Sequence, residues 1–167
     1  MIVEIRGRDE DTHQPSAIDV TNHRLKVDTG SIWTIRYVDD EAPNDSNKVI
    51  AVPANMIWHL LAARVELATD ANAGNRQLEL RILDNAADIQ WSVVPDLTQA
   101  ASLTYNYNFG PSMADLNAVR DTTWVSTPIP PTLILPAGSQ VNILDNNAVS
   151  IAGDDMVVHL TVAQRNA

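Results

Sequence analysis

Apolar and polar residues alternate along most of this chain, as they do in strands that bury one face. The clearest case is the stretch 55–83, where apolar residues recur at every second position on both sides of the polar segment 70–75. Residues 70–75 tolerate positive φ or bond their own backbone, so the chain can reverse there at low cost. The pattern predicts a half-buried antiparallel hairpin. Its first strand carries Ile57, Leu61, Ala63, Val65 and Leu67 on one face, and its second carries Leu78, Leu80 and Ile82.

A helix is the alternative for 55–69, because the segment is rich in leucine, alanine and other good helix formers. Ile57, Leu60, Leu61 and Arg64 also have helical spacing. The alternation over 77–82, however, needs a partner strand across the short turn. We therefore favour the strand interpretation.

The same alternation recurs between segments rich in Pro, Gly, Asn and Asp. It predicts strands at 32–39, 48–52, 56–69, 76–83, 89–94, 100–109, 122–127, 132–135, 140–144 and 156–163. One helical segment is predicted at 112–120, after Pro111. The segment 126–131 contains three prolines, so it must cross between elements or lie at a sheet edge. The fold class is therefore all-β, an antiparallel β-sandwich or barrel.

The first thirty residues differ from the rest, because short β-prone runs are separated by polar breaks. We predict an extended N-terminal arm at 1–30, followed by a β-sandwich domain at 31–167. The apolar residues of the arm are too interrupted to form a core of their own, and such a segment gains order by adding strands to a neighbour. The arm residues predicted to bind a partner are Ile2, Val3, Ile5, Ile18, Val20, Leu25 and Val27.

Composition narrows the class of partner. With 167 residues and 45% hydrophobic content, the chain can bury one core, filled mainly by aliphatic side chains because it has one Phe and three Tyr. A formal net charge of −10 has the wrong sign for phosphate contacts, so we expect no nucleic-acid partner. There is no cysteine, and no run of eighteen apolar residues or secretory leader occurs. We expect no membrane partner and a chain that stays in the cytoplasm or assembles there into something larger.

Three segments together resemble small jelly-roll virion proteins of tailed phages, the capsid decoration or cement proteins. They are the strand–turn–strand segment 58–80, the run Leu133-Ile134-Leu135-Pro136-Ala137-Gly138-Ser139 with its following strands to 162, and the opening 5–27. The resemblance covers about two thirds of the chain and lies in hairpins and turns, with no catalytic signature. Between residues 85 and 124 the sequence departs from the pattern of these proteins.

The resemblance implies a non-enzymatic protein that binds the major capsid protein and stabilises the shell. It implies a jelly-roll sandwich on the capsid surface of the virion, assembled in the host cytoplasm and often a homotrimer. We predict an oligomer interface at Trp91, Trp124 and Ile129, because small β-sandwiches with several Trp and proline-rich edges commonly complete their burial against copies of themselves. The alternatives are a carbohydrate-binding or host-adhesion module and a neck or tail component.

Candidate catalytic chemistry is sparse. Of His13, His23, His59 and His159, none has the spacing of a local metal site, so a histidine site would have to be assembled across strands. His59 alternates with Ile57 and Leu61, which predicts a hydrogen-bonded histidine in the core or an interface. The sequence has no G-x-S-x-G elbow and no glycine-rich phosphate loop. We predict no enzyme, no catalytic residue and no cofactor.

Carboxylates and tryptophans each leave an alternative open. The carboxylates at 9–11, 39–41, 84–88 and 153–155 are predicted to be solvated turns, and calcium in one of these loops is the alternative. We predict no metal site, because none of the loops has EF-hand spacing. Trp33, Trp58, Trp91 and Trp124 are assigned to the core or a subunit interface. Exposed aromatic side chains around one loop end would instead favour sugar binding.

Overall fold

The computed structural model describes residues 7–8, 15–16, 32–114 and 121–167. The chain divides into two units, Met1–Ile32 and Trp33–Ala167. In the first unit, β1 (Gly7–Arg8) pairs with β2 (Pro15–Ser16) in a short antiparallel ladder. All seven partner-binding residues predicted in the arm lie outside the described residues, as do His13 and His23.

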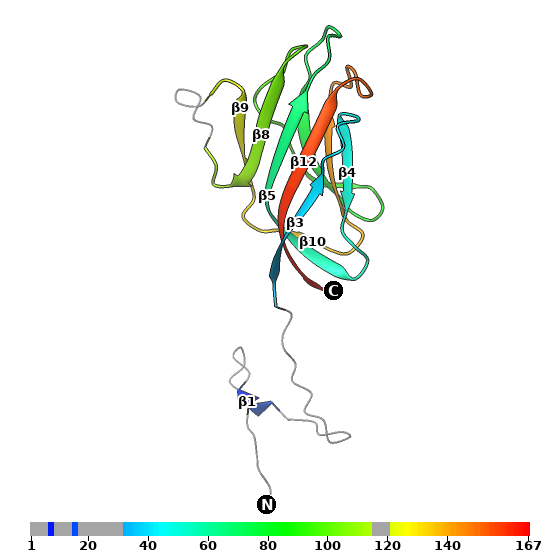
Figure 1. The fold of residues 1–167 in the computed structure, drawn as a ribbon. Coiled ribbons are helices and arrows are strands. Elements are labelled where there is room, and N and C mark those ends of the chain that lie inside the picture. Colours follow the sequence, from blue (N-terminus) through cyan, green and yellow to red (C-terminus); the bar gives the residue numbers. More distant parts are fainter. Residues whose placement is uncertain (1–6, 9–14, 17–31, 115–120) are drawn as a thin grey trace, which may run out of the picture. The chain divides into compact units, whose positions relative to one another are not determined.

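The second unit is a sandwich of two sheets (Figure 1). The larger sheet has the order β3 (Thr34–Asp40), β12 (Asp155–Asn166), β5 (Met56–Ala68), β8 (Thr104–Pro111) and β9 (Trp124–Ile129), with β10 (Leu133–Leu135) also paired to β5. The smaller sheet has the order β4 (Asn47–Ala51), β11 (Gln140–Asp145), β6 (Leu78–Leu83) and β7 (Ile89–Val93). Each of the ten predicted strands is present, and the described residues contain no helix. The predicted all-β sandwich is confirmed.

The predicted hairpin is wrong, although both of its strands exist. β5 belongs to the larger sheet and β6 to the smaller one, so the two strands do not pair. β5 pairs instead with β12 and β8, and β6 pairs with β11 and β7. Their apolar rows face each other across the core, where Leu67, Leu78 and Leu80 are fully buried. The segment 69–77 therefore crosses between sheets.

A β-bulge changes which side chains of β5 face the core. Thr161 of β12 is opposite Ala62, but Val162 is opposite Leu60, so Leu61 is an extra residue without an opposite partner. An extra residue shifts the period-two alternation by one position. Trp58 and Leu60 are consequently buried, and Ile57 and Leu61, which simple alternation places with Ala63, are only partly buried.

The other edge of the larger sheet contains a parallel pair. β9 pairs only with β8 among the described strands, and the two run parallel, so the sheet is mixed rather than wholly antiparallel. Pro128 lies in β9 opposite Gly110. The sequence prediction that 126–131 occupies an edge is thus confirmed for β9. Of the predicted helix at 112–120, residues 112–114 form a turn and coil, and 115–120 lie outside the described residues.

The core between the two sheets is mainly aliphatic, as the composition predicts. Its aromatic members are Trp58, Tyr107 and Phe109. Tyr107 is fully buried and donates its hydroxyl to Gln99 Oε1 at 3.0 Å. Burial raises the pKa of Tyr107, so its hydroxyl stays a donor.

Candidate interaction surface

Large apolar side chains lie exposed on the outer face of the larger sheet. We call them the apolar surface: Trp33 (39% exposed), Ile35 (55%), Tyr37 (72%) and Ile134 (50%). The strand registers place one row across four strands, with Ile35 opposite Ala163, Ala163 opposite His59, and His59 opposite Ile134. These side chains therefore belong to one face. An exposed apolar patch of this kind is typical of interaction sites.

Polar groups hold part of this surface in place. The guanidinium of Arg165 lies 4.9 Å from the centre of the Trp33 ring, and the Trp33 and His59 rings meet edge to face at 6.3 Å. His59 Nε2 lies 2.9 Å from the carbonyl oxygen of Pro131. His59 is thus hydrogen-bonded as predicted, but it lies on the outer face of the sheet and not in the core. The Trp33 ring is therefore held by contacts with Arg165 and His59.

The smaller sheet offers no comparable patch among the described residues. Val49 and Ile89 are 50% and 55% exposed, close to the values for Ile134 and Ile35. They lie on β4 and β7, which are the two opposite edges of that sheet. Separate exposed apolar residues are ordinary in soluble proteins. The apolar surface is therefore a feature of the larger sheet, beside its β3 edge.

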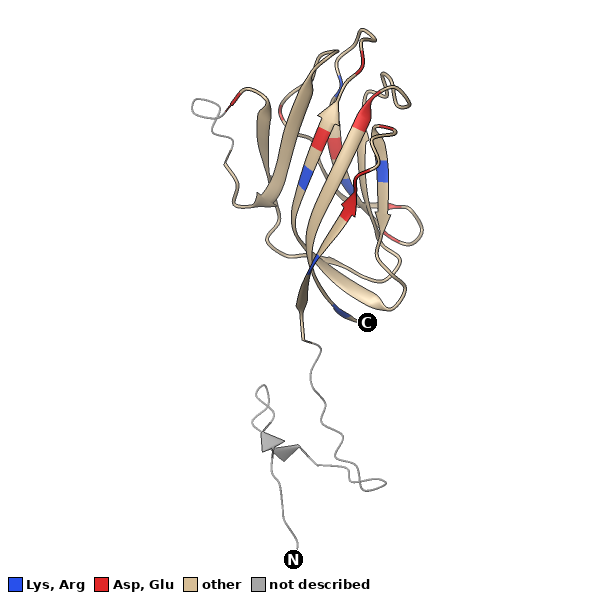
Figure 2. Cartoon of the chain, viewed as in Figure 1, with Lys and Arg blue, Asp and Glu red and all other residues tan. Residues whose placement is uncertain are grey.

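Carboxylates gather at the opposite end of the sandwich, which we call the loop end (Figure 2). The loop end contains the ends of β3, β5 and β11 and the starts of β4, β6 and β12, which the strand registers bring together. Its carboxylates are Asp39, Asp40, Glu41, Asp45, Asp70, Asp145, Asp154 and Asp155. Along β12, Asp155 and Ala163 of the apolar row are eight positions apart, about 25 Å of strand. The loop end is thus the more acidic end of the sandwich. We call the other end the apolar end, because it carries most of the apolar surface; its carboxylates are Asp84 and Asp88, in the loop after β6.

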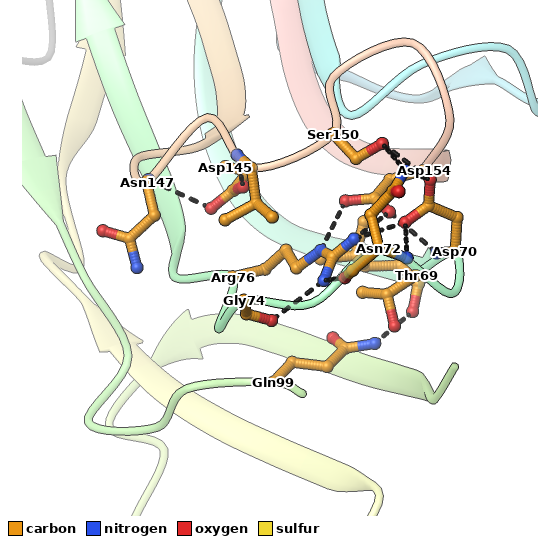
Figure 3. A network of polar contacts seen from close by, with 12 residues as sticks. Thr69, Asp70, Asn72, Gly74, Arg76, Gln99, Asp145, Asn147, Ser150 and Asp154 are labelled. Atoms are coloured by element: carbon orange, nitrogen blue, oxygen red, sulfur yellow. Dashed lines mark hydrogen bonds and ion pairs between the residues drawn. The ribbon is translucent and has the colours of Figure 1, made fainter. Parts of the chain in front are cut away.

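Arg76 is the centre of a buried network at the loop end (Figure 3). Its side chain is fully buried, and its Nε and Nη2 donate to both carboxylate oxygens of Asp154 at 2.8 and 2.9 Å. Nη1 donates to the carbonyl oxygens of Asn72 and Gly74, and Nη2 donates to Asp70 Oδ1. All five guanidinium donors are therefore used within the chain.

Asp154 and Asp145 connect this network to two loops. Asp154 is fully buried and also accepts the backbone N–H of Asp70 at 2.8 Å. Asp145 accepts backbone N–H groups of Gln77, Asn147 and Val149. The network joins the loop 69–77 to the loop 146–154 and fixes the crossing between sheets. The prediction of a solvated turn at 153–155 is therefore wrong for Asp154, and the network is structural because no donor of Arg76 is left for a ligand.

Gly153 allows the loop to approach the network closely. A Cβ atom at this position would collide with the Asp70 carboxylate and with Ser150 Oγ. The two groups that it would meet are already bonded to each other, since Ser150 Oγ donates to Asp70 Oδ2 at 2.6 Å. A side chain here would force the hydrogen-bonded pair apart.

Two carboxyl groups link the stability of the unit to pH. The hydrogen bond from Ser150 is the main cause that holds the pKa of Asp70 below its ordinary value of 3.8, with Asn72 and Arg76 adding to it. The hydrogen bond from Arg81 holds the pKa of Glu79 below 4.5. A lowered pKa in the folded state stabilises the fold above the unfolded-state pKa, and this contribution is lost as the pH falls through the folded-state value.

We expect the free energy of unfolding to decrease as the pH falls below about 4.5, as Glu79 and Asp70 take up protons. Urea unfolding followed by circular dichroism, from neutral pH to about pH 3, measures this dependence. Asp70→Asn should make the acid loss shallower, because that group no longer titrates. Equal pH slopes for the wild-type chain and Asp70→Asn would contradict the assignment to Asp70.

A second carboxylate group could supply ligands to a divalent cation. The group consists of Asp39, Glu41 and His159. One possible ligand atom from each of these side chains lies within 4.8 Å of the other two. The register of β3 with β12 places Asp39 opposite His159, so the group is assembled from two neighbouring strands. His159 Nδ1 and Asp39 Oδ1 lie 3.0 Å apart and bond to each other. In this structure Asp39 and His159 are therefore hydrogen-bonded to each other on the sheet surface.

The three residues predicted at an oligomer interface have different positions. Ile129 is 4% exposed and belongs to the core, because β9 turns it inward, so it cannot form an interface contact. Trp91 is partly buried and packs against the core. Trp124 is 41% exposed, with the Arg64 guanidinium 5.8 Å from the centre of its ring. Of the three, Trp124 has the largest accessible fraction.

In comparisons with known proteins, the chain matches no protein-family model and no curated protein. Among the described residues, no helix is long and apolar enough to cross a membrane.

Proposed function

We propose that this chain is a non-enzymatic structural protein that attaches to a protein shell and stabilises it, as a capsid decoration protein of a tailed phage. The observation that carries the proposal is the apolar surface beside the β3 edge. Trp33, Ile35 and Tyr37 alternate along one strand with their side chains on one face, and Ile134 continues the row. Burial of a large apolar side chain contributes about 1.5–3 kcal/mol. Several such side chains per copy, repeated over a shell, would add substantially to its cohesion.

Charge supports one orientation on the shell. The carboxylates of the loop end favour water, because an unpaired charge is costly to bury. The apolar end has fewer carboxylates, Asp84 and Asp88 beside the smaller sheet, and its Arg165 guanidinium lies against the Trp33 ring. We therefore place the apolar surface against the major capsid protein and the loop end toward solvent. We propose that the arm, residues 1–30, binds the same partner.

The finer features of the proposal follow from the resemblance. They are a jelly-roll connection of the strands, a homotrimer, and a location on the outer surface of the virion after assembly in the host cytoplasm. Trp124 is the predicted interface residue that best suits a contact between copies, given its exposure. Light scattering at micromolar concentration measures the oligomeric state, and a strict monomer would remove the trimer.

Sugar binding is less well supported than attachment. A sugar platform needs aromatic rings that converge at one site, but Trp33 and Trp124 belong to opposite ends of the larger sheet. The row of the sheet that contains Trp124 crosses β5 at Glu66. Trp33 comes directly before Thr34, whose row crosses β5 at Trp58. Eight residues of β5, about 25 Å of strand, separate these rows.

The direct test is sedimentation of the purified chain with undecorated capsids of its parent phage. Saturable co-sedimentation with the shell supports the proposal. Binding only to isolated tails or necks would favour the tail alternative, and binding only to host polysaccharide would favour adhesion.

Deleting residues 1–30, so that the chain begins at Ser31, should weaken binding to capsids and leave the melting temperature of the sandwich nearly unchanged. The arm would contribute strand pairing to the partner, whereas the sandwich core is formed by residues after Trp33. Co-sedimentation and thermal melting are compared with those of the full chain. Equal affinity would show that the arm makes no attachment contact, and a chain that cannot fold would show that the arm belongs to the sandwich.

A further inference from the structure

A cleft lies at the open side of the sandwich, between the edge strands of the two sheets. Its volume is about 420 Å³, which is in the range of ligand-binding clefts. Its lining includes Arg36, Tyr37 and Asp39 of β3, Ile50 and Ala51 of β4, and Trp58 of β5. The cleft thus combines an apolar base with charged and polar groups from its β3 side.

Both strands that border the cleft have an unpaired edge within the described part of the chain. β3 pairs with β12 alone, and β4 pairs with β11 alone. Edge strands are usually protected from further pairing by proline, bulges or a short length, and β9 at the other edge of the larger sheet contains Pro128. β3 extends over 7 residues, TIRYVDD, without proline. It therefore presents an edge that can accept another strand.

Trp58 contributes a buried, unpaired polar group beside the cleft. The residue is 3% exposed, and its indole Nε1–H has no hydrogen-bond partner. Buried donors in folded proteins are nearly always paired, and an unpaired donor is unfavourable. Trp58 lines the cleft, but its Nε1 is itself fully buried, so a bound segment must enter between the surrounding side chains to provide an acceptor oxygen.

We propose that this cleft binds an extended polypeptide segment of the shell subunit, which adds to β3 as a further strand and offers an oxygen to Trp58. The proposal rests on the proposed function and names how that partner is held. A polypeptide suits the site better than a compact small molecule, because the unpaired edge of β3 offers a row of backbone donors and acceptors. Alternate side chains of the segment would meet Ile50 and Trp58, and the others would face solvent.

Photo-cross-linking identifies the occupant. The full chain carries p-benzoylphenylalanine at Ala51, an exposed residue that lines the cleft, and is irradiated on undecorated capsids. The control carries the same group at Ala152, an exposed alanine in the loop end. We expect Ala51, but not Ala152, to cross-link to one peptide of the shell subunit. Cross-links from Ala51 only to residues 1–31 of another copy, or no cross-link beyond the control, would overturn the proposal.

Two substitutions test the site by affinity. Ala51→Arg fills the cleft and should weaken co-sedimentation with capsids at least about tenfold, whereas Ala152→Arg should not. Trp58→Phe removes the donor and keeps an aromatic ring, so affinity should fall about tenfold if the bound segment supplies the acceptor. Melting temperatures verify that each variant is folded. If the wild-type chain binds and Ala51→Arg binds equally well, the cleft proposal fails and the proposed function stands. If the wild-type chain does not bind capsids, the proposed function fails.

Discussion

Arg76→Met should lower the free energy of unfolding by about 3–5 kcal/mol, the usual cost of removing one partner of a buried ion pair. Asp154 has no exposed surface and receives two hydrogen bonds from the guanidinium. Methionine keeps much of the side-chain volume but supplies no donor. The substitution therefore leaves a buried carboxylate without its cation, and it releases the carbonyl oxygens of Asn72 and Gly74.

Arg64→Met is the matched control for this experiment. The Arg64 side chain is 45% exposed, and its nearest contact with Glu66 is 3.5 Å. Ion pairs at an exposed surface contribute about 0–1 kcal/mol, so the control should change stability little. Urea unfolding at neutral pH compares the two variants. A loss for Arg76→Met no larger than that for Arg64→Met would show that the network does not hold the loop end together.

The double substitution Ile35→Lys and Ile134→Lys should weaken binding to undecorated capsids by at least about a hundredfold. Each residue would lose an apolar contact of about 2 kcal/mol, and each added ammonium would lie in the interface. Both side chains are half exposed, so the free protein should stay folded. Neither residue lines the cleft between β3 and β4, so the lining of the cleft is unchanged.

Val49→Lys with Ile89→Lys is the corresponding control on the smaller sheet. These residues are 50% and 55% exposed, the same values as those of Ile134 and Ile35. The control should bind as the wild-type chain does, because its lysines lie on the other sheet. Co-sedimentation measures both variants in parallel. Equal loss in the two would mean that added positive charge, and not the apolar surface, decides binding.

Strand positions could be predicted from the sequence because alternation is a local property. Pairing could not, because alternation indicates which side of a strand is buried and not which strand lies beside it. Leu78 and Leu80 meet the side chains of β5 across the core, an arrangement with the same local pattern as a hairpin. The bulge at Leu61 could not be predicted from the sequence either, because it depends on the register between β5 and β12.

The candidate surfaces show the same limit. Trp33, Ile35 and Tyr37 form a visible alternation in the sequence, but their exposure depends on β3 being an edge strand. Arg76 and Asp154 are 78 positions apart, so no local motif connects them. An arginine within a polar turn and a run of acidic residues each suggest solvent when considered alone. Only the crossing between the two sheets brings them together.

Cryo-electron microscopy of capsids decorated with this chain tests the central claim most directly. The account predicts density for the sandwich on the outer surface of the shell. The apolar surface, beside the start of β3 and β10, should contact the major capsid protein, and the loop end should face solvent. Density confined to the neck or tail, or a sandwich whose acidic loop end faces the shell, would contradict it.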